Sequence, residues 1–372
     1  MKKHPIIWTN VILFSLTFLV AAIAVPYYAL TVGFTAAEII ATILCMGYCG
    51  ISITAGYHRL WAHKTYDAHP VLQWIFAIGG AFALQNSAIH WSSDHRVHHR
   101  HVDNNEKDPY SAGRGFWYSH IGWMLRDYQG ESYFDYSNVR DLQKNPILAF
   151  QHKHYLVLVL LTNIGIPLLL GLLVGNIWGM LLSVGVLRLV LSHHFTFFIN
   201  SLAHIWGKQT YTDENSARDN GFLAFLTYGE GYHNYHHIFE YDYRNGIRWW
   251  QFDPTKWLIK TCSYLKLTGN LRTVPEDRIA QAVAKMQLKR AKDKARHLPN
   301  AEQLLALLEQ EYQLLVAKIQ DYYQFKKELL QQKRNALVDQ YHASEFMQRY
   351  QELKLHLQQQ QNHWQRLTAA FS

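Results

Sequence analysis

Four long apolar segments stand out in the first 200 residues of the chain. They cover residues 6–30, 36–55, 155–174 and 178–200, and each is about as long as the roughly 20 residues that a helix needs to cross a bilayer. Short turns join the first segment to the second and the third to the fourth, which predicts two transmembrane hairpins. The two turns contain no lysine or arginine, whereas the amino terminus and the long polar regions do. We therefore expect both termini and the polar regions on the cytoplasmic side.

A fifth apolar stretch, residues 71–89, is expected to stay on the cytoplasmic side rather than to cross the membrane. It contains two glutamines and Asn86, side chains that are costly in lipid. A single crossing would also separate His63 from His95, which we interpret below as parts of one site. The stretch therefore predicts a buried or interfacial helix.

The last part of the chain, residues 300–372, has a different character and is rich in Gln, Leu, Lys and Glu. Its apolar positions recur at spacings of three and four with an interruption near Lys326, which predicts an amphipathic helix or a helical hairpin. We interpret residues 1–295 as a membrane domain and residues 300–372 as a coiled-coil-like extension. The pattern leaves open whether the extension self-associates or docks a redox partner or the membrane.

The composition agrees with a membrane protein that has a large polar part. Hydrophobic residues make up 49% of the 372 residues and charged residues 17%, against about 25% in a typical soluble protein. The formal net charge of +8 suits an anionic membrane surface or an anionic ligand. No block of lysine or arginine resembles a stripe that binds a nucleic acid backbone, so nucleic acid is not expected as a partner. The three cysteines are too few for a disulfide framework.

Histidine changes the picture, because the chain has 22 of them and they are clustered. The motif H-x-x-H-H occurs twice, at His95, His98 and His99 and at His233, His236 and His237. In a helix, positions i+3 and i+4 lie on the same side as position i, so each motif directs three imidazoles one way. Such a motif favours a metal site.

Two weaker histidine elements lie at the ends of apolar segments. His58 and His63 are five residues apart, which turns an α-helix by about 140°, so we expect this pair to converge where the second membrane helix ends. Asn200 and His204 lie one turn apart at the end of the fourth. All four elements fall on the predicted cytoplasmic side, where they can meet.

The number of imidazoles exceeds the needs of one metal ion and suits two. Imidazole binds iron, copper, zinc and nickel, so the ligand type does not name the metal. Ligand histidines also need orienting partners on the other ring nitrogen. The acidic candidates nearby in the sequence are Asp94, Asp103, Asp108 and Glu230.

The segments HRLWAH, DHRVHH, NSLAH and GEGYHNYHH, in this order and setting, resemble the integral-membrane fatty acid desaturases, specifically the acyl-CoA Δ9 (stearoyl-CoA) branch. The resemblance extends from about residue 8 to residue 290, and the short core looks bacterial. It implies an all-α membrane protein with four transmembrane helices in two hairpins under a helical cytosolic cap that holds two irons. The implied iron ligands are His58, His63, His95, His98, His99, His204, His233, His236 and His237, with Asn200 contacting one iron through water.

The resemblance also implies an activity. It is the oxygen-dependent desaturation of a saturated long-chain fatty acyl-CoA, with a cis double bond introduced at Δ9. Two electrons must come from an external donor, such as ferredoxin, rubredoxin or a b-type cytochrome with its reductase. The implied location is a multi-pass protein of the bacterial inner membrane. The alternative enzyme uses the same histidine motifs to desaturate an acyl-lipid or to hydroxylate a lipid. The alternative from another class of protein is a membrane carrier of metal or haem.

Proteins of this family bend the acyl chain in a tunnel lined by a Gln, a Trp and a Thr. The corresponding residues here, together with the other expected substrate contacts, are Gln85, Trp91, Thr196, Asn86, Asp94 and Arg126. Two departures from the family pattern concern Ser93, where animal enzymes carry a basic residue, and Glu240, where proline is usual. The pattern favours CoA as the carrier and leaves an acyl-lipid open.

Overall fold

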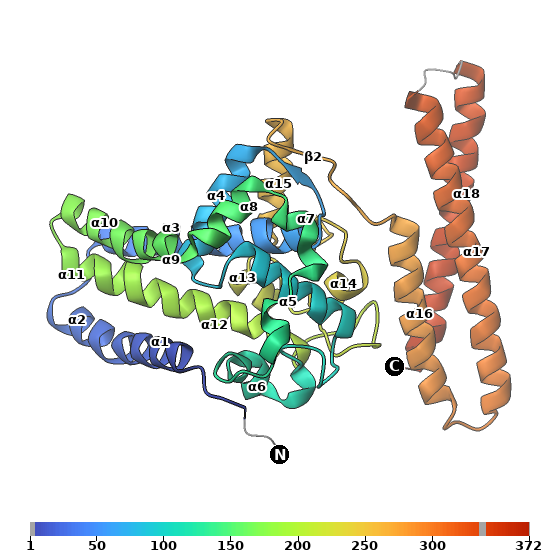
Figure 1. The fold of residues 1–372 in the computed structure, drawn as a ribbon. Helices are drawn as coiled ribbons and strands as arrows, with labels where there is room; N and C mark the ends of the chain where they lie inside the picture. The colour runs from blue at the N-terminus through green and yellow to red at the C-terminus, as the bar shows by residue number, and fades with distance from the viewer. Residues whose placement is uncertain (1–3, 335–339, 372) are drawn as a thin grey trace. The chain divides into compact units, whose positions relative to one another are not determined.

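The computed structural model describes residues 4–334 and 340–371, and its regular structure is almost entirely helical (Figure 1). This confirms the all-α fold class predicted from the sequence. The chain forms two compact units. The first comprises the chain up to Gln209 together with Glu214–Thr273, and the second comprises Thr210–Asp213 and the chain from Val274 onward. The boundary between a membrane domain and an extension near residues 295–300, which we inferred from the sequence, stays a prediction.

Four helices of the described chain are long and apolar enough to cross a membrane: Trp8–Thr31, Ala36–Ala62, Tyr155–Val174 and Ile177–His204. Each contains a π-helical segment. In order, they consist of α1 (Trp8–Leu19), η1 (Val20–Ala24) and α2 (Val25–Thr31); α3 (Ala36–Ile51) and η2 (Ser52–Ala62); α9 (Tyr155–Leu160), η7 (Leu161–Gly165) and α10 (Ile166–Val174); and α11 (Ile177–Met180), η8 (Leu181–Leu187), α12 (Arg188–Asn200) and η9 (Leu202–His204).

The second and fourth of these helices run beyond the ends indicated by the apolar pattern, to Ala62 and His204. Their last turns carry polar side chains such as His58, Arg59 and His204, which are nearly fully buried in protein. Burial against the polar part of the first unit, rather than contact with lipid, therefore satisfies these residues. At the start of the second helix, Thr35 and Glu38 form a capping box.

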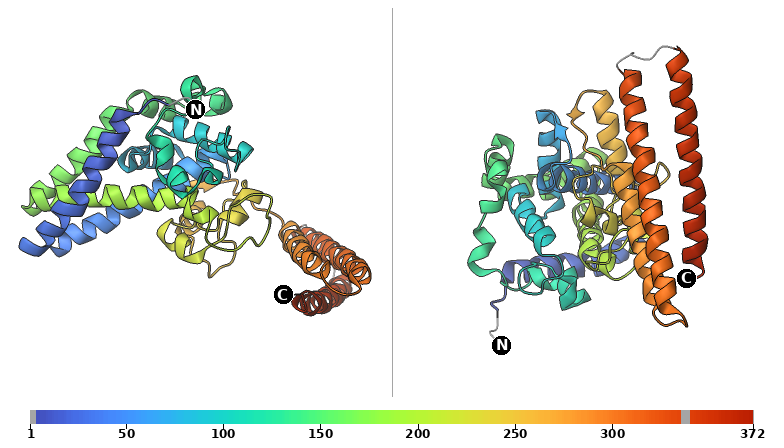
Figure 2. Two further views of the ribbon diagram at one scale, coloured as in Figure 1. Left: turned by 90° about the horizontal axis from the view of Figure 1, so that it is seen from below. Right: turned by 90° about the vertical axis from the view of Figure 1, so that its right-hand side faces the viewer.

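The rest of the first unit forms a cap at one end of the four long helices (Figures 1 and 2). Its helices are α4 (Pro70–Ala83), α5 (Ala88–His101), α6 (Phe116–His120), α7 (Arg140–Gln143), α8 (Pro146–Lys153), α13 (Gly221–Leu226), α14 (His233–Ile238) and α15 (Pro254–Tyr264). Short 3₁₀ turns, η3 (Ala112–Arg114), η4 (Gly122–Met124), η5 (Gly130–Phe134) and η6 (Ser137–Val139), connect some of them. Two short strands, β1 (Asp67–Ala68) and β2 (Thr268–Gly269), pair antiparallel.

The apolar stretch at residues 71–89 forms α4 followed by a turn and the start of α5. At 14 residues α4 is too short to cross a bilayer, in agreement with the expectation of a buried or interfacial helix. It ends at Leu84, whose left-handed backbone (φ 52°) turns the chain so that Gln85 and Asn86 leave the helix.

Glycines allow α4 to lie directly on η2. A Cβ atom added at Gly80 would overlap the ring of Tyr57, and one added at Gly79 would overlap Ser52. Tyr57 cannot move away easily, because it is fully buried and its hydroxyl accepts a hydrogen bond from Gln151 (2.6 Å). This close packing fixes the part of η2 that carries His58.

The second unit contains three long helices, α16 (Glu276–Ala295), α17 (Ala301–Arg334) and α18 (Gln340–Ala369). Buried apolar side chains from all three, such as Leu288, Leu315 and Trp364, form its own core. The interruption in the apolar spacing near Lys326 lies within α17, which continues to Arg334. The helix stays intact there because Tyr322 and Leu329, seven residues apart, continue the buried stripe.

We predict that Gly80→Ala lowers the free energy of unfolding by about 1–3 kcal/mol, because the new methyl group overpacks against Tyr57. Gly47→Ala is the matched control. Gly47 lies in α3, where an added Cβ meets nothing within 4 Å, so this variant should be as stable as the wild type or slightly more stable. Thermal unfolding of both variants in detergent measures the difference. Equal stability of the two would contradict the packing described.

Candidate metal centre

The nine histidines singled out in the sequence come together in two groups, and within each group the candidate ligand nitrogens lie within 4.8 Å of one another. The first group consists of His58, His63, His95, His99 and His236. The second group consists of His98, His204, His233 and His237. Each group takes residues from three or more elements, namely η2 and its end, α5, the end of the fourth membrane helix, and α14. Asn200 ends α12 and lines the cavity described below.

The π-helix explains how His58 and His63 join one group. In an α-helix, residues five apart point about 140° away from each other. In η2 the backbone follows the i→i+5 pattern, and the amide of His63 donates a hydrogen bond to the carbonyl of His58 (3.1 Å). The two rings consequently lie on neighbouring turns, with centroids 4.8 Å apart. The sequence argument relied on the end of the helix to bring this pair together, whereas the structure uses a change of helix type.

All nine imidazoles can direct the same atom, Nε2, toward the middle of their group. In the first group, Nε2 of His236 lies 3.0 Å from that of His58 and 3.0 Å from that of His99. Nε2 of His63 lies 2.8 Å from that of His95.

The second group repeats this arrangement. Nε2 of His237 lies 3.0 Å from that of His233 and 3.3 Å from that of His98. Nε2 of His204 lies 3.1 Å from that of His233. Four nitrogens therefore approach one another from four side chains.

The Nδ1 atoms show which nitrogen carries the proton. Carboxylate oxygens lie 2.8 Å from Nδ1 of His58, 2.9 Å from Nδ1 of His98 and 3.1 Å from Nδ1 of His99. An ionised carboxylate only accepts hydrogen bonds, so these Nδ1 atoms hold the protons and the Nε2 atoms present lone pairs.

Lone pairs that face each other at about 3 Å repel unless a cation lies between them. Bonds of about 2.1 Å from imidazole nitrogens to a metal ion place neighbouring nitrogens about 3 Å apart. The spacing of the Nε2 atoms thus fits two ions, one in each group. The residues present are neutral nitrogen ligands with ionised partners behind them, the arrangement common to metal-bound histidines.

Burial prepares the imidazoles for this role. Desolvation lowers the pKa of His63, His95, His233 and His236 well below the ordinary value, and neighbouring imidazoles lower it further. For His99 burial lowers the pKa to about 4. The rings are therefore neutral at physiological pH, as metal binding requires.

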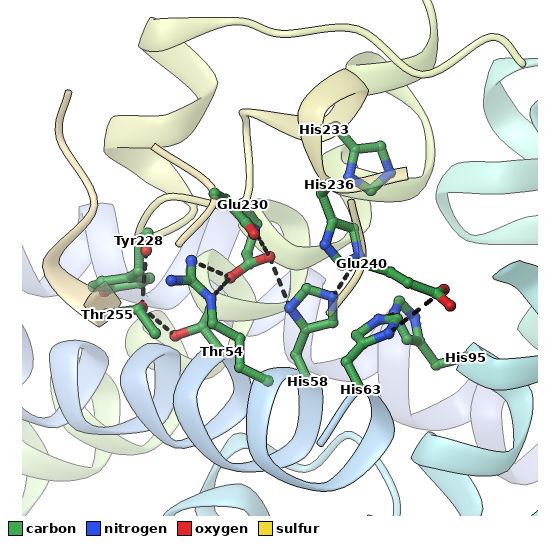
Figure 3. Close-up of polar contacts among 12 residues, drawn as sticks. Thr54, His58, His63, His95, Tyr228, Glu230, His233, His236, Glu240 and Thr255 are labelled. Carbon is green, nitrogen blue, oxygen red and sulfur yellow. Dashed lines mark hydrogen bonds and ion pairs between the residues drawn. The ribbon is translucent and has the colours of Figure 1, made fainter. Parts of the chain in front are cut away.

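A buried network of charges holds the carboxylate behind His58 (Figure 3). Glu230 Oε2 accepts a hydrogen bond from Asn245 (2.6 Å), and Oε1 accepts two from Arg59 (2.9 and 3.2 Å). Arg59 also contacts Asp253, which is fully buried. Burial alone would raise the pKa of Glu230, but His58 and Arg59 lower it below its ordinary value, so the carboxylate stays ionised.

A cavity of about 430 Å³ reaches both groups of histidines. His58 and His95 of the first group and His233 of the second group line it. All six residues predicted from the resemblance as substrate contacts line it as well: Gln85, Asn86, Trp91, Asp94, Arg126 and Thr196. Its volume lies within the range of small-molecule sites.

The cavity brings together residues that are far apart in the sequence. Gln85 donates a hydrogen bond to Thr196 (2.9 Å), which joins the turn after α4 to α12. The ring of Trp91 stacks on His95 with centroids 4.7 Å apart. Asn86 donates to the hydroxyl of Tyr133 (3.2 Å).

Two of the four acidic candidates lie directly behind predicted ligands, namely Glu230 behind His58 and Asp108 behind His98. Asp103 contacts a predicted ligand through Ser216. It accepts hydrogen bonds from the amide and the hydroxyl of Ser216, and this hydroxyl is 2.7 Å from Nδ1 of His204. Asp94 instead lies 3.4 Å from His90, which belongs to neither group.

The sequence reasoning missed other partners of the imidazoles. The hydroxyl of Tyr110 lies 3.2 Å from Nδ1 of His95, and Ser216 contacts His204. Neither residue belongs to a recognisable motif, and both reach the site through loops. A sequence signal for them would have required knowing the path of those loops.

Comparisons with known proteins agree with this geometry. The family model described as fatty acid desaturase matches residues 35–268. A protein of Schizosaccharomyces pombe named a probable acyl-CoA desaturase is 45% identical over 68% of this chain and 52% of its own length. Acyl-CoA desaturase 1 of Saccharomyces cerevisiae is 43% identical over 66% of this chain and 48% of its own length. The sn-2 palmitoyl-lipid 9-desaturase of Nostoc is 37% identical over 60% of this chain and 78% of its own length. The chain thus spans about half the length of the two fungal relatives.

We predict that the purified protein binds two equivalents of a divalent metal and that the two groups load separately. His63→Ala should keep the second equivalent and His233→Ala the first, because each variant removes a ligand from one group only. Metal at a thousandfold excess over its Kd should stabilise the fold by about 4 kcal/mol for each equivalent bound. Elemental analysis and thermal unfolding with and without chelator measure these effects. Binding of one equivalent by the wild type, or unchanged stoichiometry in both variants, would contradict the prediction that each group binds its own metal ion.

A second prediction concerns the charge network. Glu230→Ala should lower the free energy of unfolding of the metal-free protein by about 3 kcal/mol, because buried donors of Arg59, His58 and Asn245 lose their acceptor. Glu131→Ala, at an exposed position, should change it by less than about 0.5 kcal/mol. Chemical unfolding in detergent after chelation compares the two. A Glu230 variant as stable as the Glu131 variant would refute the network.

Proposed function

Because this chain belongs to the fatty acid desaturase family, we propose that it desaturates a saturated long-chain fatty acyl-CoA in a membrane, introducing a cis double bond at Δ9. The reaction removes one hydrogen from each of two adjacent methylenes. Dioxygen takes up these two hydrogens with two electrons and two protons, and two waters form. The names of the two fungal relatives support acyl-CoA as the substrate class, and the name of the cyanobacterial relative supports position 9.

The cavity is the observation that carries this proposal. All four long helices contribute apolar side chains to its walls, for example Phe14 from α1, Met46 from α3, Leu156 from α9 and Phe195 from α12. One region of the same cavity is lined by His58, His95 and His233. An alkyl chain inside it would lie against both groups of candidate ligands in surroundings from which water is excluded.

We propose that the two groups bind iron, with Asn200 contacting one ion through water. When bound, two irons would supply the chemistry with dioxygen that breaks an unactivated C–H bond, which side chains alone cannot do. The imidazoles would hold the ions, and Glu230, Asp108 and Glu240 would keep their Nδ1 protons in place.

The remaining cavity residues would position the acyl chain. Gln85 and Thr196 are joined by a hydrogen bond, and both line the cavity together with Trp91. We propose that these three side chains set the bend of the acyl chain next to the histidine ligands. Asn86, Asp94 and Arg126 would contact the carrier at the polar end.

The electrons would come from an external donor such as ferredoxin, rubredoxin or a b-type cytochrome with its reductase. The four apolar helices and the family indicate an integral membrane protein. We propose that the histidine groups and both termini face the cytoplasm. The bacterial inner membrane expected from the short core stays a prediction, since two of the three relatives described are fungal.

A second candidate is a desaturase that acts on acyl chains of membrane lipids. The cyanobacterial relative is named for a lipid substrate. In addition, Arg126 is the one Lys or Arg among the described residues that line the cavity, and Asp94 and Asp127 line it too, so cations for the phosphates of CoA are few. Hydroxylation of a lipid would start from the same hydrogen removal.

We predict that the protein restores monounsaturated fatty acids in a host unable to make them, with the double bond at Δ9. His236→Ala should abolish the product because it removes a ligand, whereas His297→Ala, an exposed histidine of α16's C-terminal turn, should leave it unchanged. Mass spectrometry of the lipids reads out product and bond position. Absence of monoenes with the wild type, or their presence with His236→Ala, would overturn the proposal.

The same host distinguishes the alternatives. Membranes given labelled stearoyl-CoA should yield the labelled monoene in the CoA pool before it enters phospholipid. Its first appearance in phospholipid would favour the lipid desaturase, and a hydroxylated product would favour the hydroxylase.

A further inference from the structure

Glu240 is an exposed carboxylate at an otherwise buried metal centre. It follows α14 by two residues, and its side chain is 53% exposed, whereas that of Glu230 is 4% exposed. Its Oε2 atom lies 3.1 Å from Nδ1 of His99 and 3.8 Å from Nδ1 of His63. Figure 3 shows its carboxylate directed toward the imidazoles of the first group.

The two imidazoles that face Glu240 come from different elements. His63 lies at the end of η2 and His99 in the last turn of α5, and both belong to the first group. Oε2 lies within hydrogen-bond distance of the Nδ1–H of His99 and fixes the proton on that ring, so that its Nε2 remains free to bind a metal. The Nδ1 of His63 is too far away for a hydrogen bond, and the negative charge of Glu240 attracts its N–H without one. The contact thereby connects η2 to α5 through a residue that follows α14.

His99 also touches the second group. Its ring stacks on that of His237, with centroids 4.4 Å apart and planes 9° apart. A change in the orientation of His99 would therefore alter the packing of ligands in both groups.

We propose that Glu240 is a positioning residue for the first group: its carboxylate orients His99 by a hydrogen bond and attracts the N–H of His63, and its negative charge favours the more highly charged state of the bound metal. The inference rests on the proposed iron centre and adds to it a residue that touches neither metal nor substrate. It also implies that the reduction midpoint of this centre depends on an exposed side chain.

Anaerobic titration of the full-length, metal-free protein in detergent with Fe²⁺ against a chromophoric chelator tests this inference. Glu240→Ala should weaken one of the two equivalents by about tenfold, the lower end of the range for losing the partner of a metal-bound histidine, because the side chain is half exposed. Glu240→Gln should weaken it less, since the amide oxygen still accepts a hydrogen bond. In both variants the reduction midpoint should shift to more positive values, because the charge is gone.

Glu106→Ala is the matched control. Glu106 is exposed on the loop after α5, and the structure gives it no contact with the nine imidazoles. This control should bind both equivalents as the wild type does. All three variants should unfold at the same temperature as the wild type when metal-free.

The outcomes separate this inference from the proposed function. If the wild type binds two irons and Glu240→Ala binds both as tightly with the same midpoint, Glu240 has no positioning role while the iron centre stands. Equal weakening by Glu106→Ala, or a Glu240→Gln variant no better than Glu240→Ala in affinity, would also overturn the role. A wild-type protein that binds no iron would overturn the proposed function itself.

Discussion

The mutual repulsion of nitrogen lone pairs is the constraint on which the rest of the first unit depends. Nine imidazoles direct Nε2 atoms at one another at about 3 Å, and hydrogen bonds cannot satisfy all of these atoms at once. Such an arrangement costs free energy unless cations occupy the centres. Three features of the surrounding structure hold the imidazoles in place without a cation. Carboxylates contact the Nδ1 atoms, a buried arginine keeps Glu230 charged, and glycines let α4 pack closely against η2.

Helix type is as important here as helix position. The five-residue spacing of His58 and His63 would direct the two rings apart on a regular α-helix. The π-helical geometry of η2 places them on neighbouring turns, so that one segment of chain supplies two imidazoles to the same group. The H-x-x-H-H motifs need no such adjustment, and both lie on ordinary α-helices. Two different helical periods therefore serve the same centre, each matched to the spacing of its own histidines.

Much of this was accessible from the sequence, and the limits have physical causes. Apolar length predicted four long helices, and motif spacing singled out most of the histidines of the site, because both depend on local periodicity. The division of each H-x-x-H-H motif between the two groups was not foreseen, because it depends on how the helices pack. The ends of the second and fourth helices were missed because His58, Arg59 and His204 are polar yet buried by distant parts of the chain. The contacts of Tyr110 and Ser216 could not be foreseen, since loops carry them to His95 and His204. The interruption in the apolar spacing near Lys326 does not end α17, because the next apolar position of the buried stripe, Leu329, is buried again.

The ion network around Arg59 has a consequence for biogenesis. Arg59 lies in the second long helix, and Asp253, one of its partners, follows it by 194 residues. Until the ribosome has made Glu230 and Asp253, the guanidinium lacks both of its counter-charges, and the histidines of η2 and α5 lack those of α14. The centre is thus completed late in synthesis, after all four long helices have been made. Neither group of histidines has its full set of ligand nitrogens before α14 has been synthesised.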